Sequence, residues 1–169
     1  MKSYSDKIVT ALILDKGESI FEVLEKVAME KELPAGFITG IGAVEDVIIG
    51  CFNKEKKGYI ENKLNGLHEL LALNGNLSWK DEKPFIHLHA IMGCEDGSVL
   101  GGHLLQAKIA VTGEFFFHLF NGHLEREFVP EFGLYLIKGT SKNYNFGSRS
   151  RHAKILTAGI HRSISKIKT

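Results

Sequence analysis

Residues 69–111 read ELLALNGNLSWKDEKPFIHLHAIMGCEDGSVLGGHLLQAKIAV, and this stretch decides the fold. Apolar and polar residues alternate from Phe85 to Ala90, which is the period of a β-strand. We predict strands at Phe85–Cys94 and Gly101–Val111, because the turn residues Glu95–Ser98 separate them. A chain reversal at that turn would place the two strands side by side and antiparallel.

The segment Glu69–Ser78 at the start of this stretch has two interpretations. It is one strand with a bulge or bend at Asn74-Gly75, or that Asn-Gly pair is a two-residue hairpin turn between two short arms. Both interpretations add strand to the same antiparallel sheet.

The elements on either side extend this pattern. An early helix is predicted at Gly17–Glu32, where apolar residues recur at steps of three and four, and Pro34 ends it. Further strands are expected at Lys7–Leu14, from Phe37 onward, at Val47–Phe52, at Glu114–Phe120 and at Gly133–Lys138. One long early helix with many strands predicts an α+β fold, a two-layer α/β arrangement with a mainly antiparallel sheet.

The length and hydropathy of the chain are those of an ordinary globular protein. Its 169 residues suit one domain with a core of its own. Only about seven apolar residues precede Asp15, which is short for the apolar core of a signal peptide. No segment approaches the ~18 continuous apolar residues of a membrane span. We therefore expect a cytoplasmic protein without a membrane partner.

The charge is divided unevenly along the chain. Residues 1–131 hold 13 Lys and Arg against 20 Asp and Glu, a net charge of −7. Residues 132–169 hold 8 Lys and Arg and no acid, a net charge of +8. We interpret residues 1–138 as the domain and residues 139–169 as a basic C-terminal extension. The candidate DNA contacts of this extension are Arg149, Arg151, Lys154 and Arg162.

Three histidines in the two central strands form a candidate metal site. Strand alternation puts the rings of His87 and His89 on one face, with their Cα atoms about 7 Å apart. The hairpin would bring His103 back beside them. Three imidazoles can bind one ion and leave a fourth position for water or substrate, as in catalytic zinc sites. Zinc is therefore the expected cofactor, although imidazole also suits copper, nickel or iron.

Two acids in apolar predicted strands are candidates for a role beside the histidines. A carboxylate among apolar residues is costly unless it is paired, so Glu69 and Glu114 are expected to have partners. Each could orient a ligand histidine, act as a general base on metal-bound water, or pair with Arg126. An exposed strand end explains Glu114 equally well.

Six motifs occur in a fixed order within about residues 6–138. They are DKGE (15–18), GFITGIGA (36–43), ELLALNGN (69–76), HLHA (87–90), GGHL (101–104) and TGE (112–114). Together they resemble the plants-and-prokaryotes-conserved (PPC) domain family. The resemblance implies a compact α/β domain with a mainly antiparallel sheet that assembles as a homotrimer. It also implies that His87, His89 and His103 are metal ligands and that Glu69 is the glutamate of a family motif.

The resemblance also implies an association with DNA. Plant members join the domain to separate AT-hook segments that bind DNA, and single-domain members are often labelled DNA-binding by analogy. This chain has GSRSR at residues 147–151 but no Pro-Arg-Gly-Arg core for the minor groove. The basic extension lies beyond the part of the chain that carries the resemblance.

Three functions are compatible with these features. The first is a homotrimeric PPC-domain protein with a three-histidine metal site and a DNA-associated role. The second is a metal-dependent enzyme acting on an unidentified small molecule, and the third is a trimeric interaction module without catalysis. Because residues 1–131 are net acidic and repel phosphate, DNA contacts are expected only in the basic extension.

Overall fold

The computed structural model describes residues 1–6 and 8–138. The predicted extension at residues 139–169 lies outside them, and so do its candidate DNA contacts Arg149, Arg151, Lys154 and Arg162. The division of the chain at residue 138 therefore stays a prediction. No helix in the described part of the chain is long and apolar enough to cross a membrane.

The described residues are mostly β-strand. The helix is α1 (Ile20–Glu30). The strands are β1 (Lys2–Ser5), β2 (Val9–Asp15), β3 (Ala35–Asn53), β4 (Gly58–Leu64), β5 (His68–Lys80), β6 (Lys83–Gly93), β7 (Val99–Phe120), β8 (Arg126–Val129) and β9 (Leu134–Ile137).

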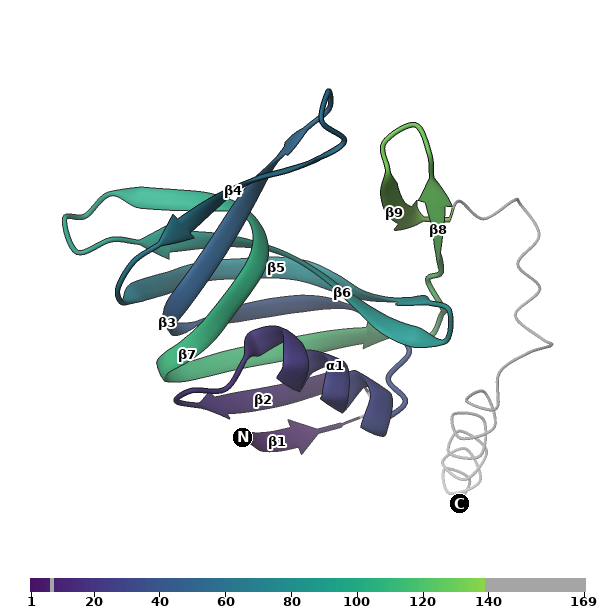
Figure 1. Cartoon of the computed structure of the whole chain (residues 1–169). Helices are drawn as coiled ribbons and strands as arrows, with labels where there is room; N and C mark the ends of the chain where they lie inside the picture. The colour runs from purple at the N-terminus through teal and green to yellow at the C-terminus, as the bar shows by residue number, and fades with distance from the viewer. Residues whose placement is uncertain (7, 139–169) are drawn as a thin grey trace, which may run out of the picture. The chain divides into compact units, whose positions relative to one another are not determined.

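The strands pair antiparallel in one large sheet and one small one. The large sheet has the order β1-β2-β7-β6-β5-β3-β4, and β8 pairs separately with β9. The long strands β3 and β7 also pair with each other. A closed ring of hydrogen-bonded strands therefore results from the pairings β3–β5, β5–β6, β6–β7 and β7–β3. Figure 1 shows the long strands crossing the molecule and the β3–β4 hairpin projecting from it.

One face of the large sheet packs against α1 and forms the core. Leu24 and Val27 of the helix belong to the same buried cluster as Leu88, Phe115 and Phe117 of the sheet. Figure 1 shows α1 lying across the strands. Because strand side chains alternate, the residues between these buried ones point to the opposite face. We call that opposite face the outer face.

The fold class expected from the sequence is wrong. Strand accounts for 68% of the structure and helix for 8%, so the fold is β-rich and mostly antiparallel. It is neither the expected α+β nor a two-layer α/β fold with one long helix. The helix is shorter than Gly17–Glu32 because Ser19 is its N-cap and accepts a hydrogen bond from the Glu22 N–H. At the other end Glu32 has a φ of 47°, which is outside the helical range.

The strands are also longer than expected, because they continue through glycines that resemble breaks. Strand β3 passes through Gly40 and Gly42, with a register shift between them, and β7 passes through Gly113. Strand β5 passes through Asn74-Gly75, so the single-strand interpretation is right and the hairpin turn is wrong. The register shift of β5 lies between Leu70 and Ala72 rather than at Asn74-Gly75.

Strands β1, β4 and β8 are not expected from the sequence. Two of them, β1 and β4, are the edge strands of the large sheet. Edge strands bury little surface and therefore lack the clear apolar alternation on which the prediction depends. Strand β4 bears on function, because it carries Tyr59.

Candidate metal centre

Strand β6 and the beginning of β7 position the three histidines. In β6, Ile86 and Leu88 are buried, so alternation directs His87 and His89 to the outer face. His89 lies directly opposite His103 of β7 in the strand register. The expected hairpin therefore forms and brings the third histidine beside the first two.

The three rings converge on one region. Their centroids are 5.1 Å apart for His87 and His89, 5.0 Å for His87 and His103, and 5.2 Å for His89 and His103. Each residue offers one ring nitrogen, and these nitrogens lie within 4.8 Å of one another. Metal–nitrogen bonds of about 2.0–2.1 Å require nitrogens about 3.4 Å apart, so modest ring rotations would complete the geometry. The predicted cluster is confirmed.

Two of the three histidines favour their neutral form. Burial, followed by the positive charges of Arg126 and His89, lowers the pKa of His87 to about 4. Burial, followed by His87, His89 and Arg126, lowers the pKa of His103 to about 4. A neutral imidazole has the free lone pair that a metal requires. The fold therefore keeps these two rings ready to bind an ion at neutral pH.

The surroundings of His103 also fit a bound ion. Its Nδ1 atom is buried and has no hydrogen-bond partner among the described residues, an arrangement that costs roughly 1–3 kcal/mol. Tyr59 stacks on the His103 ring, with centroids 4.4 Å apart and planes inclined by 20°. The stacking fixes the orientation of the ring. A metal ion is a suitable partner for an unpaired imidazole nitrogen, because it accepts the lone pair of that nitrogen.

Arg126 of β8 contacts the cluster at His87. Its Nη2 donates to Oδ1 of Asn76 at 3.0 Å and lies 3.4 Å from Nδ1 of His87. Its Nε donates to Oγ of Ser78 at 2.7 Å, and the guanidinium lies 4.4 Å from the centre of the Phe85 ring. No local pattern in the sequence signals this contact, because only the fold brings β8 next to β6.

Glu69 and Glu114 are exposed and lie away from the histidines of their own chain. Glu69 lies opposite Gly93 of β6. Gly93 is four residues beyond His89 and therefore roughly 13 Å from it along the strand. Glu114 is eleven residues beyond His103 in β7. Neither pairs with Arg126, which takes part in no ion pair within residues 1–6 and 8–138. The suggested role of the two acids stays a prediction.

A cavity of about 280 Å³ opens beside the cluster. His89, His103 and Tyr59 line it, together with Gly101 and Gly102. The two glycines have no side chains to fill the space next to the rings. A small molecule can therefore approach two of the three histidines directly.

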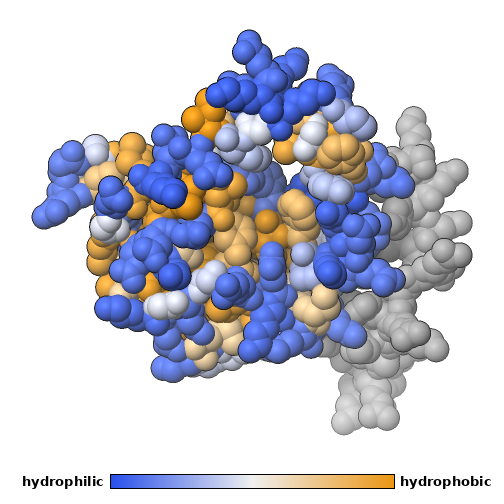
Figure 2. All heavy atoms as spheres, in the orientation of Figure 1, coloured by the Kyte–Doolittle hydropathy of each residue, from blue (hydrophilic) through white to orange (hydrophobic). Residues whose placement is uncertain are grey.

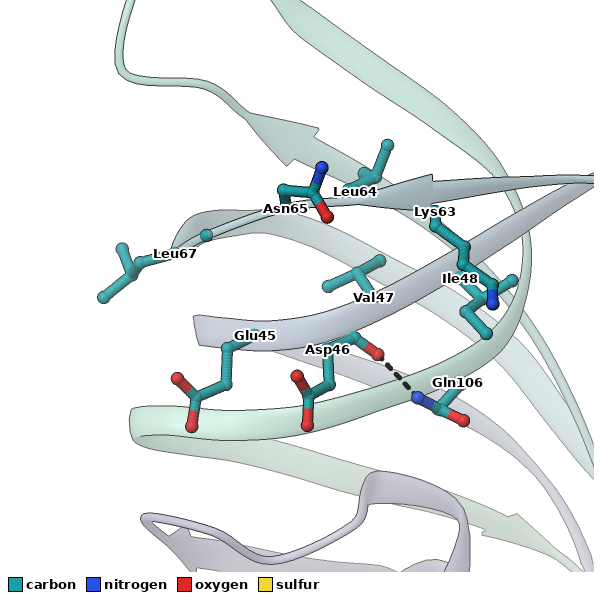
Figure 3. A pocket seen from close by; sticks show the side chains of 10 residues that line it. Glu45, Asp46, Val47, Ile48, Lys63, Leu64, Asn65, Leu67 and Gln106 are labelled. Atoms are coloured by element: carbon teal, nitrogen blue, oxygen red, sulfur yellow. Dashed lines mark hydrogen bonds between the residues drawn. The ribbon is translucent and has the colours of Figure 1, made fainter.

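A second cavity, of about 410 Å³, lies where β3, β4 and β7 meet. Figure 3 shows Glu45 and Asp46 side by side at its edge, and Gln106 Nε2 donating to the carbonyl oxygen of Asp46 at 3.0 Å. Lys108 pairs with the Asp46 carboxylate at 2.9 Å. In the described part of the chain, metal-ligating side chains converge in a group of three only at the histidines. Although the second cavity is larger, the histidine cluster is therefore the better candidate site.

The sequence was also compared with known protein families. It matches the Plants and Prokaryotes Conserved (PCC) domain over residues 1–121, which is the family named PPC above. The chain belongs to this family. No curated protein sequence matches it at a significant level.

This PPC domain is similar to several solved structures. A plant- and prokaryote-conserved protein from Pyrococcus horikoshii is 31% identical, with 83% of this chain and 95% of that chain covered and a TM-score of 0.73. A metal-containing protein from Archaeoglobus fulgidus is 36% identical, with 82% and 100% covered and a TM-score of 0.71. A candidate DNA-binding protein from Bacteroides thetaiotaomicron is 28% identical, with 81% and 96% covered and a TM-score of 0.77.

Proposed function

We propose that this PPC domain binds one divalent transition metal ion, zinc in the first place, through His87, His89 and His103. The proposal is carried by the convergence of the three rings. It is supported by the pKa values of about 4 for His87 and His103, which keep these ligands neutral. The 36% identical protein from Archaeoglobus fulgidus, which is described as metal-containing, gives further support.

Each residue around the cluster has a distinct part in this proposal. The histidines hold the ion, Arg126 places a positive charge 3.4 Å from His87, and Tyr59 covers one side of the His103 ring. Three ligands leave one coordination position open, where zinc would act as a Lewis acid on the group bound there. A metal-dependent enzyme acting on a small molecule would use the same position, and the cavity beside His89 favours that alternative.

We also propose that the domain assembles as a homotrimer through the outer face of the sheet. Four apolar side chains on strands β3, β5 and β6 are about half exposed: Phe37 (48%), Ile41 (52%), Leu71 (51%) and Ile91 (44%). Apolar residues are also exposed among polar ones on the side of the molecule that Figure 2 shows. Exposed apolar area of this kind favours contact with another chain over a monomer. An interaction module without catalysis would use the same assembly.

The metal site lies next to this proposed interface. His87 is opposite Asn76, and Asn76 is opposite Phe37, in the registers of β6, β5 and β3. Directly opposed residues of antiparallel strands point to the same face. The row therefore runs from the histidines to the exposed apolar side chains, and trimer formation would alter the access of solvent to the metal.

Association with DNA is a weaker candidate. It is favoured by the name of the 28% identical relative and by the net charge of +8 on residues 132–169. Residues 1–131 have a net charge of −7 and repel phosphate. Residues 139–169 would have to supply the DNA contacts. The cytoplasmic location also stays a prediction.

The metal content of the purified protein tests the main proposal. Protein prepared without a histidine tag is expected to contain about one zinc or similar ion per chain, measured by elemental analysis. His89→Ala is expected to lose the ion, because two imidazoles bind it far more weakly than three. His123→Ala is the matched control, since His123 pairs with Glu125 outside the cluster. Metal-free wild-type protein, even after reconstitution with zinc, would contradict the proposal.

A further inference from the structure

The proposed metal centre carries positive charge without a compensating acid. Within residues 1–6 and 8–138, Arg126 takes part in no ion pair, and no Asp or Glu lines the cavity beside His89 and His103. Three neutral histidines around a divalent ion would add two positive charges to that of Arg126. Partly buried charges are usually paired with an opposite charge, so this site favours a negative ligand.

Arg126 is held as a fixed cation. Its Nη1 donates to the carbonyl oxygen of Tyr135 at 2.8 Å, and its Nε donates to Ser78. Its Nη2 contacts Asn76 and His87. The hydrogen bonds to Tyr135, Ser78 and Asn76 engage three of the five N–H groups of the guanidinium. Arg126 would therefore act on a ligand mainly through its charge rather than as a two-pronged hydrogen-bonding clamp.

The cavity beside the histidines offers room and a hydrogen-bond donor. Its volume is about 280 Å³, which suits a small molecule. Tyr59 lines it, and its phenol hydroxyl can donate a hydrogen bond. No acidic side chain lines this cavity. An anion entering it would meet imidazoles and a phenol but no carboxylate.

We propose that the open coordination position at His87, His89 and His103 binds a small oxyanion, a phosphate or carboxylate group, whose charge is stabilised by Arg126. This inference rests on the proposed metal site. It adds the chemical class of the ligand: a small anionic molecule rather than a neutral or cationic one.

The test uses the full chain loaded with cobalt(II), whose visible absorption spectrum changes when a ligand changes. Phosphate and acetate are titrated in separate arms at constant ionic strength. A saturable spectral change with either anion supports the inference. The anion with the lower dissociation constant identifies the chemical group that the site prefers. If cobalt binds at one ion per chain and neither anion changes its spectrum, the inference is overturned and the metal site stands. If cobalt does not bind, both proposals are overturned.

Charge variants test the role of Arg126. Arg126→Gln is expected to weaken anion binding about tenfold, because one stabilising charge is lost. The same change is expected to tighten cobalt binding, because a positive charge next to His87 is removed. General structural damage would weaken both, so the opposite signs distinguish a charge effect from loss of structure.

Two further variants complete the comparison. Arg126→Lys keeps the charge and is expected to bind the anion within about threefold of wild type. Lys26→Gln removes one exposed charge, paired with Glu30 on α1, and should behave as wild type. Equal anion affinities for wild type and Arg126→Gln would overturn the role of Arg126. Even if Arg126→Gln fails to fold, the titration of wild-type protein still tests whether the site binds an oxyanion.

Discussion

Single residues decide the protonation state of the candidate metal centre. His87 and His103 are half-buried beside Arg126, and the fold stabilises their neutral form over the charged one. In the folded chain these two imidazoles therefore resist protonation. This preference also favours metal binding, because a proton and a metal ion compete for the same nitrogen lone pair.

The stability of the metal-free protein is expected to depend on pH because of these two residues. Their folded-state pKa is about 4, against 6.5 for an ordinary histidine. Between these values the unfolded chain binds more protons, so the free energy of unfolding falls as the pH is lowered from about 6.5 toward 4. Allowing for partial exposure, we expect a loss of about 1–2 kcal/mol for each histidine.

Urea denaturation in the presence of a chelator, at pH 7.5 and 5.0, measures this loss. The double variant His87→Gln/His103→Gln cannot titrate at these positions and should lose most of the dependence. An equal free energy of unfolding for wild type at the two pH values would refute the prediction.

At the scale of elements, the pairing of β5 with β6 places His87 in the cluster. Gly75 lies opposite Leu88 in this pairing. A Cβ atom on Gly75 would lie 1.9 Å from the carbonyl oxygen of His87 and 2.7 Å from Cδ2 of Leu88. The first contact is with backbone, so the two strands would have to separate.

Gly75→Ala is therefore expected to destabilise the fold by about 3 kcal/mol, the upper end of the usual cost of overpacking. Gly58→Ala is the matched control, because its Cβ would meet only the Lys56 carbonyl oxygen, at 3.7 Å. That control should change the free energy of unfolding by no more than about 0.5 kcal/mol. Chemical denaturation measures both variants, and equal stabilities would show that the two strands can part at little cost.

At the scale of the whole molecule, the outer face is the surface through which we propose that the chain assembles. The face covered by α1 supplies the core, whereas the outer face combines the histidines with half-exposed Phe37 and Ile41. Burying one such side chain contributes about 1.5–3 kcal/mol. A trimer that contacts through this face would bury several of them at once.

Ile41→Lys is expected to convert the proposed trimer into monomers. Lysine is costly to bury in an apolar interface, but it is tolerated in the monomer because Glu114 lies opposite position 41. Light scattering after gel filtration should give the mass of one 18.8 kDa chain for the variant and of three chains for wild type. Met29→Lys on α1, where Met29 is 44% exposed, should remain trimeric. Wild-type protein with the mass of one chain would rule out the trimer.

The sequence by itself determined the family and the histidine cluster. The alternation around His87 and His89, and the turn at Glu95–Ser98, are local features of one hairpin. Local features of this kind determine which face of the strand a side chain occupies. They also bring His103 opposite His89 independently of the rest of the fold. The family motifs are likewise read directly along the chain.

The tertiary structure alone decided the fold class and the groups that surround the cluster. Glycines within β3, β5 and β7 permit bends and close approach, but in the sequence they resemble breaks between strands. Arg126 is 39 residues from His87 and Tyr59 is on an edge strand, so long-range strand pairing brings both to the site. The charge and shape of the candidate metal centre depend on these distant contacts, which no local sequence pattern encodes.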